Sequence, residues 1–135
     1  MSDALVFPDS KSGLFDLIDD TVHDGETVRA FYHLPADERG ALHGPFPIAH
    51  IYGSGGTQGY IDRVERRTVE VYAPGEQAVN VLESIVALIC GQDIETPSGY
   101  FDSITCDGTP DDVPYQSDTL NRALATVLVT SRPIN

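Results

Sequence analysis

The sequence is poor in residues typical of membrane, secreted and redox proteins. It has no tryptophan, one methionine and two cysteines, and its longest apolar run covers only residues 85–90. Because a bilayer-spanning helix needs about 20 apolar residues, we expect no membrane span. The N-terminus carries Ser2 and Asp3 rather than a basic segment, so we expect no signal peptide and a protein of the cytoplasm. Cys90 and Cys106 could form at most one disulfide, and we interpret both as structural thiols.

Basic residues are scarce as well. Eight Lys and Arg stand against 21 Asp and Glu, which gives a net charge of −13 and a pI near 4.3. Such a surface repels nucleic acid backbones and anionic membranes, so neither is an expected binding partner. The charges are also separated along the chain, since residues 91–118 contain no base while Arg63, Arg66 and Arg67 form a basic cluster. Either the acidic edge of one copy meets the basic edge of another, or both edges are solvated surfaces.

The composition predicts one folded domain over residues 1–135. A hydrophobic content of 41% and a charged content of 21% are typical of globular chains rather than disordered ones.

A first helix is predicted by apolar residues at helical spacing, namely Leu14, Leu17, Ile18 and Val22. Asp9, Ser10 or Ser12 could cap its start, and Gly25 could end it. Its final turn would then hold three aspartates, Asp19, Asp20 and Asp24, where the helix dipole disfavours negative charge.

Alternating apolar residues predict the strands. They are expected at residues 27–34, 48–52, 60–73, 100–106 and 118–132, with loops at 35–47, 53–59 and 107–114. Residues 76–90 are apolar around more than half of a helical circumference, which indicates a buried core helix. The expected α+β fold is a single mixed or antiparallel sheet with a long hairpin, bulged near Arg66, and two helices packed on it. The element order is α-β-β-β-α-β-β.

Motifs for chemistry are weak. The glycine-rich segment lacks the Lys-Ser or Lys-Thr of a phosphate loop, and Gln58 takes a glycine position of the dinucleotide fingerprint. We interpret this segment as the mobile tip of the hairpin; it consists of Gly53, Ser54, Gly55, Gly56, Thr57, Gln58 and Gly59. The four histidines and the two cysteines lack metal-ligand spacing, and no serine lies in a nucleophile elbow. We therefore expect no catalytic residue, no metal and no cofactor.

Two segments resemble the tail terminator proteins of long-tailed phages of the siphovirus type, especially those of actinobacteria. One is residues 69–75, Val-Glu-Val-Tyr-Ala-Pro-Gly, running into the core helix. The other is residues 113–122, Val-Pro-Tyr-Gln-Ser-Asp-Thr-Leu-Asn-Arg, followed by a strand closing at Thr-Ser-Arg, residues 130–132. The resemblance implies a homohexameric ring at the tail–neck junction of the virion, assembled in the host cytoplasm. Such a ring caps the tail tube, stops its polymerisation and joins the tail to the head connector, so the major tube protein and a connector protein are the implied partners.

The resemblance turns the charge separation into a hypothesis about subunit contacts. Arg63, Arg66 and Arg67 would face acids of the next subunit, namely Asp107, Asp111, Asp112 and Asp118. The glycine-rich tip would contact the tube or the connector, and an acidic lumen would let DNA pass without specific binding. Two alternatives remain: another head–tail neck subunit, or a small ligand-binding α+β domain.

Overall fold

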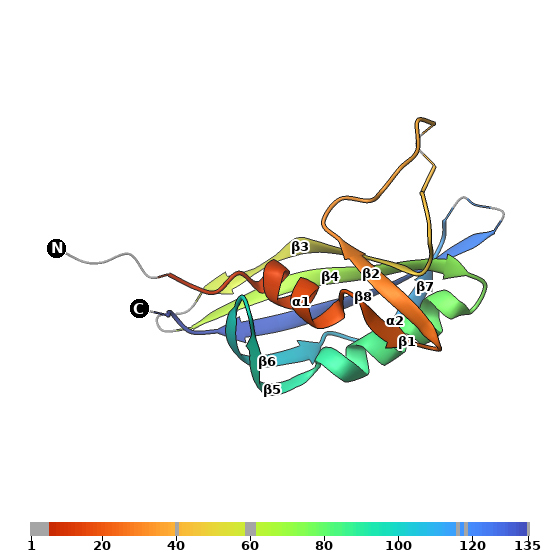
Figure 1. Cartoon of the computed structure of the whole chain (residues 1–135). Coiled ribbons are helices and arrows are strands. Elements are labelled where there is room, and N and C mark those ends of the chain that lie inside the picture. The colour runs from red at the N-terminus through yellow and green to blue at the C-terminus, as the bar shows by residue number, and fades with distance from the viewer. Residues whose placement is uncertain (1–5, 40, 59–61, 116, 118, 135) are drawn as a thin grey trace.

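The computed structural model describes residues 6–39, 41–58, 62–115, 117 and 119–134 (Figure 1). Within these ranges the elements follow the order α1 (Ser10–Ile18), β1 (Thr21–His23), β2 (Glu26–Phe31), β3 (Ile48–Gln58), β4 (Arg63–Pro74), α2 (Gln77–Ile89), β5 (Gly91–Thr96), β6 (Gly99–Cys106), β7 (Asp111–Val113) and β8 (Leu120–Ser131).

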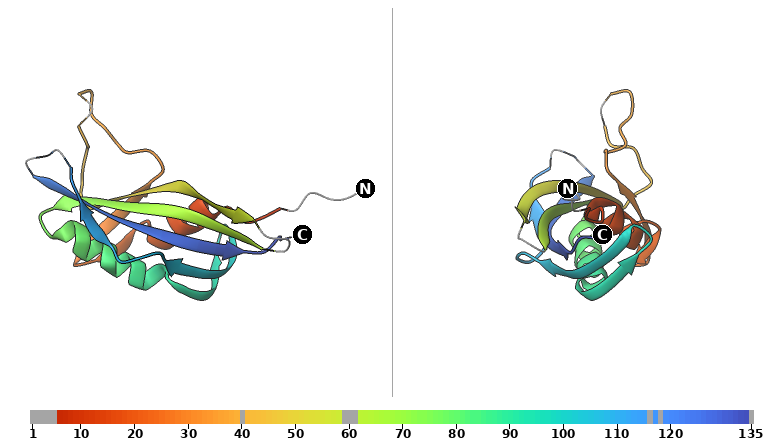
Figure 2. Two further views of the ribbon diagram at one scale, coloured as in Figure 1. Left: turned by 180° about the vertical axis from the view of Figure 1, so that it is seen from behind. Right: turned by 90° about the vertical axis from the view of Figure 1, so that its left-hand side faces the viewer.

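The described strands form one mixed sheet in the order β1-β2-β3-β4-β8-β6-β5, and β7 pairs with one end of β8. Neighbouring strands are antiparallel except β2 and β3, which run parallel. Both helices pack against the same face of the long strands, and in the end-on view of Figure 2 the sheet curves around them. The fold is therefore α+β with two helices and one mixed sheet. The predicted element order is broadly confirmed, and β1, β5 and β7 are additional strands.

The helix α1 begins as predicted and ends earlier. Asp9 is its N-cap, and its side chain accepts hydrogen bonds from the amides of Lys11 at 3.0 Å and Ser12 at 3.3 Å. The predicted continuation to Gly25 is wrong: the helix ends at Ile18, and Gly25, with φ 78°, lies in the turn between β1 and β2.

The acidic residues after α1 explain this early end. Asp19 is extended, accepts a hydrogen bond from the amide of Ala30 at 3.0 Å and pairs with Arg29 at 3.1 Å. Asp20 and Asp24 both have positive φ, a conformation that aspartate tolerates better than most residues. These three aspartates thus form turns rather than the last turn of a helix, and the expected conflict with the helix dipole does not arise.

The helix α2 forms the centre of the core, as predicted. One face of it is almost completely buried, through Ala78, Val81, Leu82, Ile85 and Ile89. This face packs on the inward side chains of β4 and β8, among them Val69, Val71, Ala123, Ala125 and Val127. On the opposite side of α2, Leu88 is 54% exposed. The aliphatic pattern located the core helix because burial on a helix repeats locally.

The predicted glycine-rich tip belongs largely to a strand. The prediction that the strand ends at residue 52 is wrong, because β3 continues to Gln58 and pairs with β4. The register shifts between Gly53 and Gly56, opposite Arg66, which matches the predicted position of the bulge. A Cβ added at Gly56 would lie 2.3 Å from the carbonyl oxygen of Val64, so only glycine fits there. Gly59 lies outside the described residues, and mobility of the segment stays a prediction.

The C-terminal half contains the clearest prediction and two missed strands. The long strand β8 is confirmed, and its alternating burial places Ala123, Ala125, Val127 and Val129 in the core. The predicted loop at 107–114 is wrong in part, because Asp111–Val113 forms β7 against β8. Residues 91–96 form the edge strand β5, which has little apolar alternation to predict it.

Residues 33–39 and 41–47, here called the arm, project from the body between β2 and β3 (Figures 1 and 2). The arm is stiffened by hydrogen bonds of its own. A bridge joins Ala36 to Leu42, the amide of Asp37 donates to the carbonyl of Ala41 at 2.8 Å, and that of His43 donates to Pro35 at 2.9 Å. The described part of the loop predicted at 35–47 thus makes hydrogen bonds of its own, and its two ends lie on adjacent strands.

Candidate functional site

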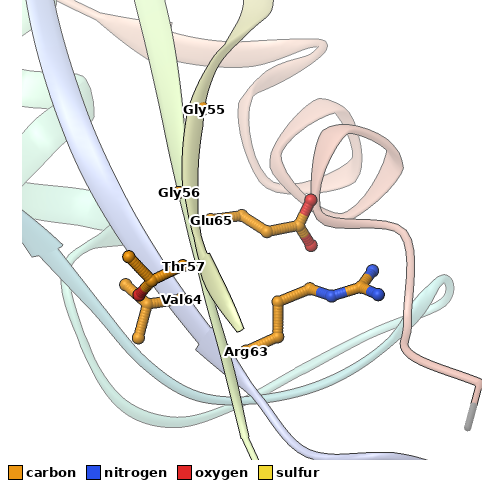
Figure 3. Close-up of a pocket in the computed structure, with 6 residues that line it drawn as sticks. All are labelled: Gly55, Gly56, Thr57, Arg63, Val64 and Glu65. Atoms are coloured by element: carbon orange, nitrogen blue, oxygen red, sulfur yellow. The ribbon is translucent and has the colours of Figure 1, made fainter. Parts of the chain in front are cut away.

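The basic cluster is divided between the two faces of β4. Successive side chains of a strand point to opposite faces, so Arg66 and Arg67 cannot lie together. Arg67 is on the helix side, where its Nε donates to Ser10 Oγ at 2.7 Å, and Arg66 is on the other side. Figure 3 shows Arg63 and Glu65 pointing toward the helix side as well. Both residues line a hollow of about 240 Å³ near the end of the hairpin.

Arg67 and Arg63 hold the N-terminal segment onto the hairpin. Arg67 pairs with Glu65, and both side chains are only 16% exposed. A Cβ at Gly53 would lie 2.3 Å from Arg67 Nη1, so the absence of a side chain there makes room for the guanidinium. The Arg63 guanidinium lies 4.1 Å from the centre of the Phe7 ring, a cation–π contact. Both arginines therefore stabilise contacts within their own chain.

Arg66 and Asp107, expected on opposite sides of a subunit contact, form an ion pair within one chain. Both side chains are nearly half exposed, and a pair of this kind contributes about 0–1 kcal/mol. Asp111 and Asp112 lie exposed on β7, and Asp118 lies outside the described residues. The subunit contact stays a prediction, and Arg66 and Asp107 would enter it as a pair already formed.

A polar cluster that the sequence did not predict lies on the helix-free face of the sheet. It is here called the Glu70 cluster and consists of His50, Tyr52, Glu70, Tyr72 and Arg122. The Glu70 side chain is only 7% exposed. Its Oε1 lies 3.3 Å from His50 Nδ1 and accepts a hydrogen bond from the Tyr72 hydroxyl at 3.4 Å. Its Oε2 lies 3.6 Å from Arg122 Nη1. A buried carboxylate is tolerated because these donors surround it.

The surroundings keep the tyrosines of the cluster neutral. Burial raises the pKa of both Tyr52 and Tyr72, and the negative charge of Glu70 raises it further. Both hydroxyls therefore remain hydrogen-bond donors at neutral pH.

The segment after β7 covers one side of the Glu70 cluster. Tyr115 meets the ring of Tyr72 edge-on at 5.1 Å, and Arg122 Nη2 donates to the carbonyl of Pro114 at 2.8 Å. The Arg122 Nε is buried without a hydrogen-bond partner. The cluster therefore joins β3, β4, β8 and this covering segment, which are far apart in the sequence.

A signal for this cluster existed in the sequence. Glu70 lies between the apolar residues Val69 and Val71, and Arg122 comes directly before the alternating small apolar residues of β8. Alternation alone places both charges on the solvent side of the sheet. The burial of Glu70 instead accompanies the strand register, which sets Arg122 opposite Tyr72, and the packing of Tyr115 on Tyr72.

His23 and Ser84 form a second polar contact that resembles a nucleophile and base. His23 Nδ1 lies 2.7 Å from Ser84 Oγ, and its Nε2 lies 2.8 Å from Thr21 Oγ1. Thr21 donates its hydroxyl proton to the carbonyl of Ile18, so it must accept from Nε2, and Ser84 donates to Nδ1. Burial lowers the pKa of His23. Ser84 lies inside α2, where the backbone amides make helix hydrogen bonds and so provide no oxyanion hole. We therefore interpret the His23–Ser84 hydrogen bond as a structural contact that holds β1 against α2.

Over the described part of the chain, no group of three His, Cys, Asp or Glu side chains could hold a metal ion. None of the described helices has the length and apolarity needed to cross a membrane. No protein-family model matches the chain, and no curated protein matches it significantly.

Proposed function

We propose that this chain is a tail terminator subunit of a long-tailed phage, a structural rather than catalytic virion protein. Copies would form a homohexameric ring that caps the tail tube, stops its polymerisation and joins the tail to the head connector. The tube protein and the connector would be its partners at the tail–neck junction, and DNA would pass through the ring without specific binding.

One observation supports this proposal above the others: the two segments that carry the resemblance lie together in space. The end of β4 pairs with the start of β8, which sets Tyr72 opposite Arg122 and Ala73 opposite Asn121. Tyr115, from the second segment, packs on Tyr72 from the first. Residues shared with a family through a common surface are expected to meet in the fold, whereas chance similarities at residues 69–75 and 113–122 have no reason to do so.

The distribution of charge is compatible with a ring whose lumen is acidic. From Thr68 to Asn121 the chain contains no lysine or arginine. Exposed acids occur on β7, at Asp111 and Asp112, and on α2, at Glu83. Such a surface would not bind the DNA backbone, because it offers no cation to replace condensed counterions.

The first test is the oligomeric state of the purified full-length chain. Native mass spectrometry and negative-stain imaging should show closed six-membered rings, and added chain should shorten the tubes formed by the cognate tube protein. A chain that stays monomeric at every concentration, alone and with tubes, would overturn the proposal. Rings that bind portal-bearing heads but not tube ends would instead identify another neck subunit.

The subunit contact is tested by charge reversal on β7. Asp111→Arg with Asp112→Arg should reduce the hexamer fraction if these acids meet a neighbouring subunit. Glu95→Arg, an exposed acid on β5, is the matched control and should leave rings intact. Arg67 is unsuitable for reversal, because its contact with Ser10 makes a folding defect the expected result. Equal hexamer fractions in both variants would remove these acids from the interface.

A further inference from the structure

The imidazole of His50 has hydrogen-bond acceptors at both ring nitrogens. Its Nδ1 lies 3.3 Å from Glu70 Oε1, and its Nε2 lies 3.1 Å from the carbonyl oxygen of Tyr32. A carbonyl oxygen can only accept, and an ionised carboxylate can only accept. A neutral imidazole offers a single N–H, so it could satisfy only one of these two contacts. The His50–Glu70 pair therefore needs one proton more than a neutral imidazole and an ionised carboxylate contain.

The neighbouring groups decide where this proton resides. Arg122, from β8, lies at the second carboxylate oxygen of Glu70 and stabilises its negative charge. The Tyr72 hydroxyl donates to Glu70, and the Tyr52 ring lies 4.9 Å from the His50 ring, so these neutral groups complete the surroundings. Because Arg122 and Tyr72 already stabilise the ionised carboxylate, the extra proton is placed on His50 as an imidazolium.

The position of His50 links this proton to the arm. Tyr32 immediately precedes the arm and His50 lies near the start of β3, just after it. Phe31 and His50 are also register partners of the parallel pair β2 and β3. The protonated imidazole thus bridges the first end of the arm to Glu70 in β4, while its own backbone holds the second end. His50 retains 18% exposure, which leaves the proton able to exchange with solvent.

We propose that His50 and Glu70 form a proton-dependent latch at the base of the arm. With the proton bound, both ring nitrogens donate, and the two ends of the arm are fixed to the sheet. When the proton leaves, one nitrogen presents a lone pair to an acceptor, and either the Glu70 or the Tyr32 contact is lost. The arm then moves more freely at higher pH, where this proton has been lost. This latch does not depend on the proposed function.

Hydrogen exchange of segment 31–50, corrected for intrinsic rates, tests the latch in the full-length protein. Protection should fall about tenfold between pH 5.5 and 8.5, the loss expected for one hydrogen bond to a charged group. In Glu70→Gln the side-chain amide can donate to Nδ1 while Nε2 still donates to Tyr32, so protection should no longer depend on pH. His43→Gln removes an arm histidine outside the latch and should keep the wild-type profile.

Nitrogen chemical shifts of the histidine rings give a readout that needs no variant. At pH 5.5 both nitrogens of His50 should be protonated in the folded wild type. A lone pair on either nitrogen at that pH would overturn the proposal, as would identical pH profiles for wild type and Glu70→Gln. Should Glu70→Gln fail to fold, the ring nitrogens of the wild type still decide the question.

Discussion

A substitution at Gly13 tests whether helix propensity or core packing has the larger effect on stability at this position. Gly13 lies inside α1, and its amide donates to the carbonyl of Asp9 at 2.9 Å. The ring of Phe101, on β6 and 1% exposed, lies directly over it. A Cβ added at Gly13 would be 2.3 Å from Phe101 Cε2 and 2.6 Å from Cζ. Glycine is required here because a buried aromatic ring occupies the space of a side chain.

The two effects of Gly13→Ala have opposite signs. In an exposed helix interior, alanine is more favourable than glycine by about 1 kcal/mol. Overpacking a well-filled core costs about 1–3 kcal/mol, and Phe101, which is 1% exposed, is packed within the core. We therefore expect Gly13→Ala to lower the free energy of unfolding by about 1 kcal/mol, equivalent to a drop in Tm of roughly 3 °C for a domain of this size.

Urea unfolding of dilute protein measures this difference. Asn80→Ala, at an exposed position of α2, is the control, because helix propensity acts there without a clash and should raise stability slightly. Gly13→Ala combined with Phe101→Leu should lose less stability than the sum of the single changes, since the smaller side chain relieves the contact. A Gly13→Ala protein more stable than wild type would refute the packing argument.

Two further outcomes follow from burial. Ile85→Ala should lower the free energy of unfolding by about 2–5 kcal/mol, because Ile85 is buried in the core. Leu88→Ala, at a 54% exposed position of the same helix, should change this free energy by less than about 0.5 kcal/mol. Equal losses of stability in denaturant titrations of the two variants would contradict the assignment of the core face. The pKa of His23 is lowered by burial, so the unfolded state binds more protons and this residue's contribution to stability falls as pH drops below about 6.5. His23→Gln should therefore flatten the pH dependence of stability between pH 5 and 7 relative to the exposed-site control His33→Gln, and unchanged slopes would rule out the desolvation effect.

The parts of the fold that the sequence predicted are those whose burial repeats locally. The core helix follows from aliphatic residues at helical spacing, and β8 follows from alternating small apolar residues. The end of α1 was predicted wrongly because Val22 continues the spacing of Leu14 and Ile18, although it is 66% exposed on β1. The aspartates before Gly25 favour a turn instead of a longer helix. The turn forms, and within it Asp20 adopts a positive φ.

The candidate sites were less predictable, because they depend on contacts between distant residues. Strand alternation already implies that Arg66 and Arg67 point to opposite faces, so the basic cluster could have been divided from the sequence. The surroundings of Glu70 could not, since Tyr115 packs on its neighbour Tyr72 and its ion pair comes from Arg122. Such a network is visible only once the register of β3, β4 and β8 is known.

The ion pairs of the structure bear on the proposed assembly of this acidic chain. Several arginines already pair with carboxylates of their own chain, namely Arg29, Arg66, Arg67, Arg122 and Arg132. A pair across a subunit boundary would exchange one such partner for another, and an exchange between exposed ion pairs gains little free energy. The remaining surface acids repel one another between copies at low salt. In the proposed ring, attraction between subunits would therefore come from apolar contacts, for which the exposed Leu88 is a candidate, while the charges would select the geometry in which repulsion is least.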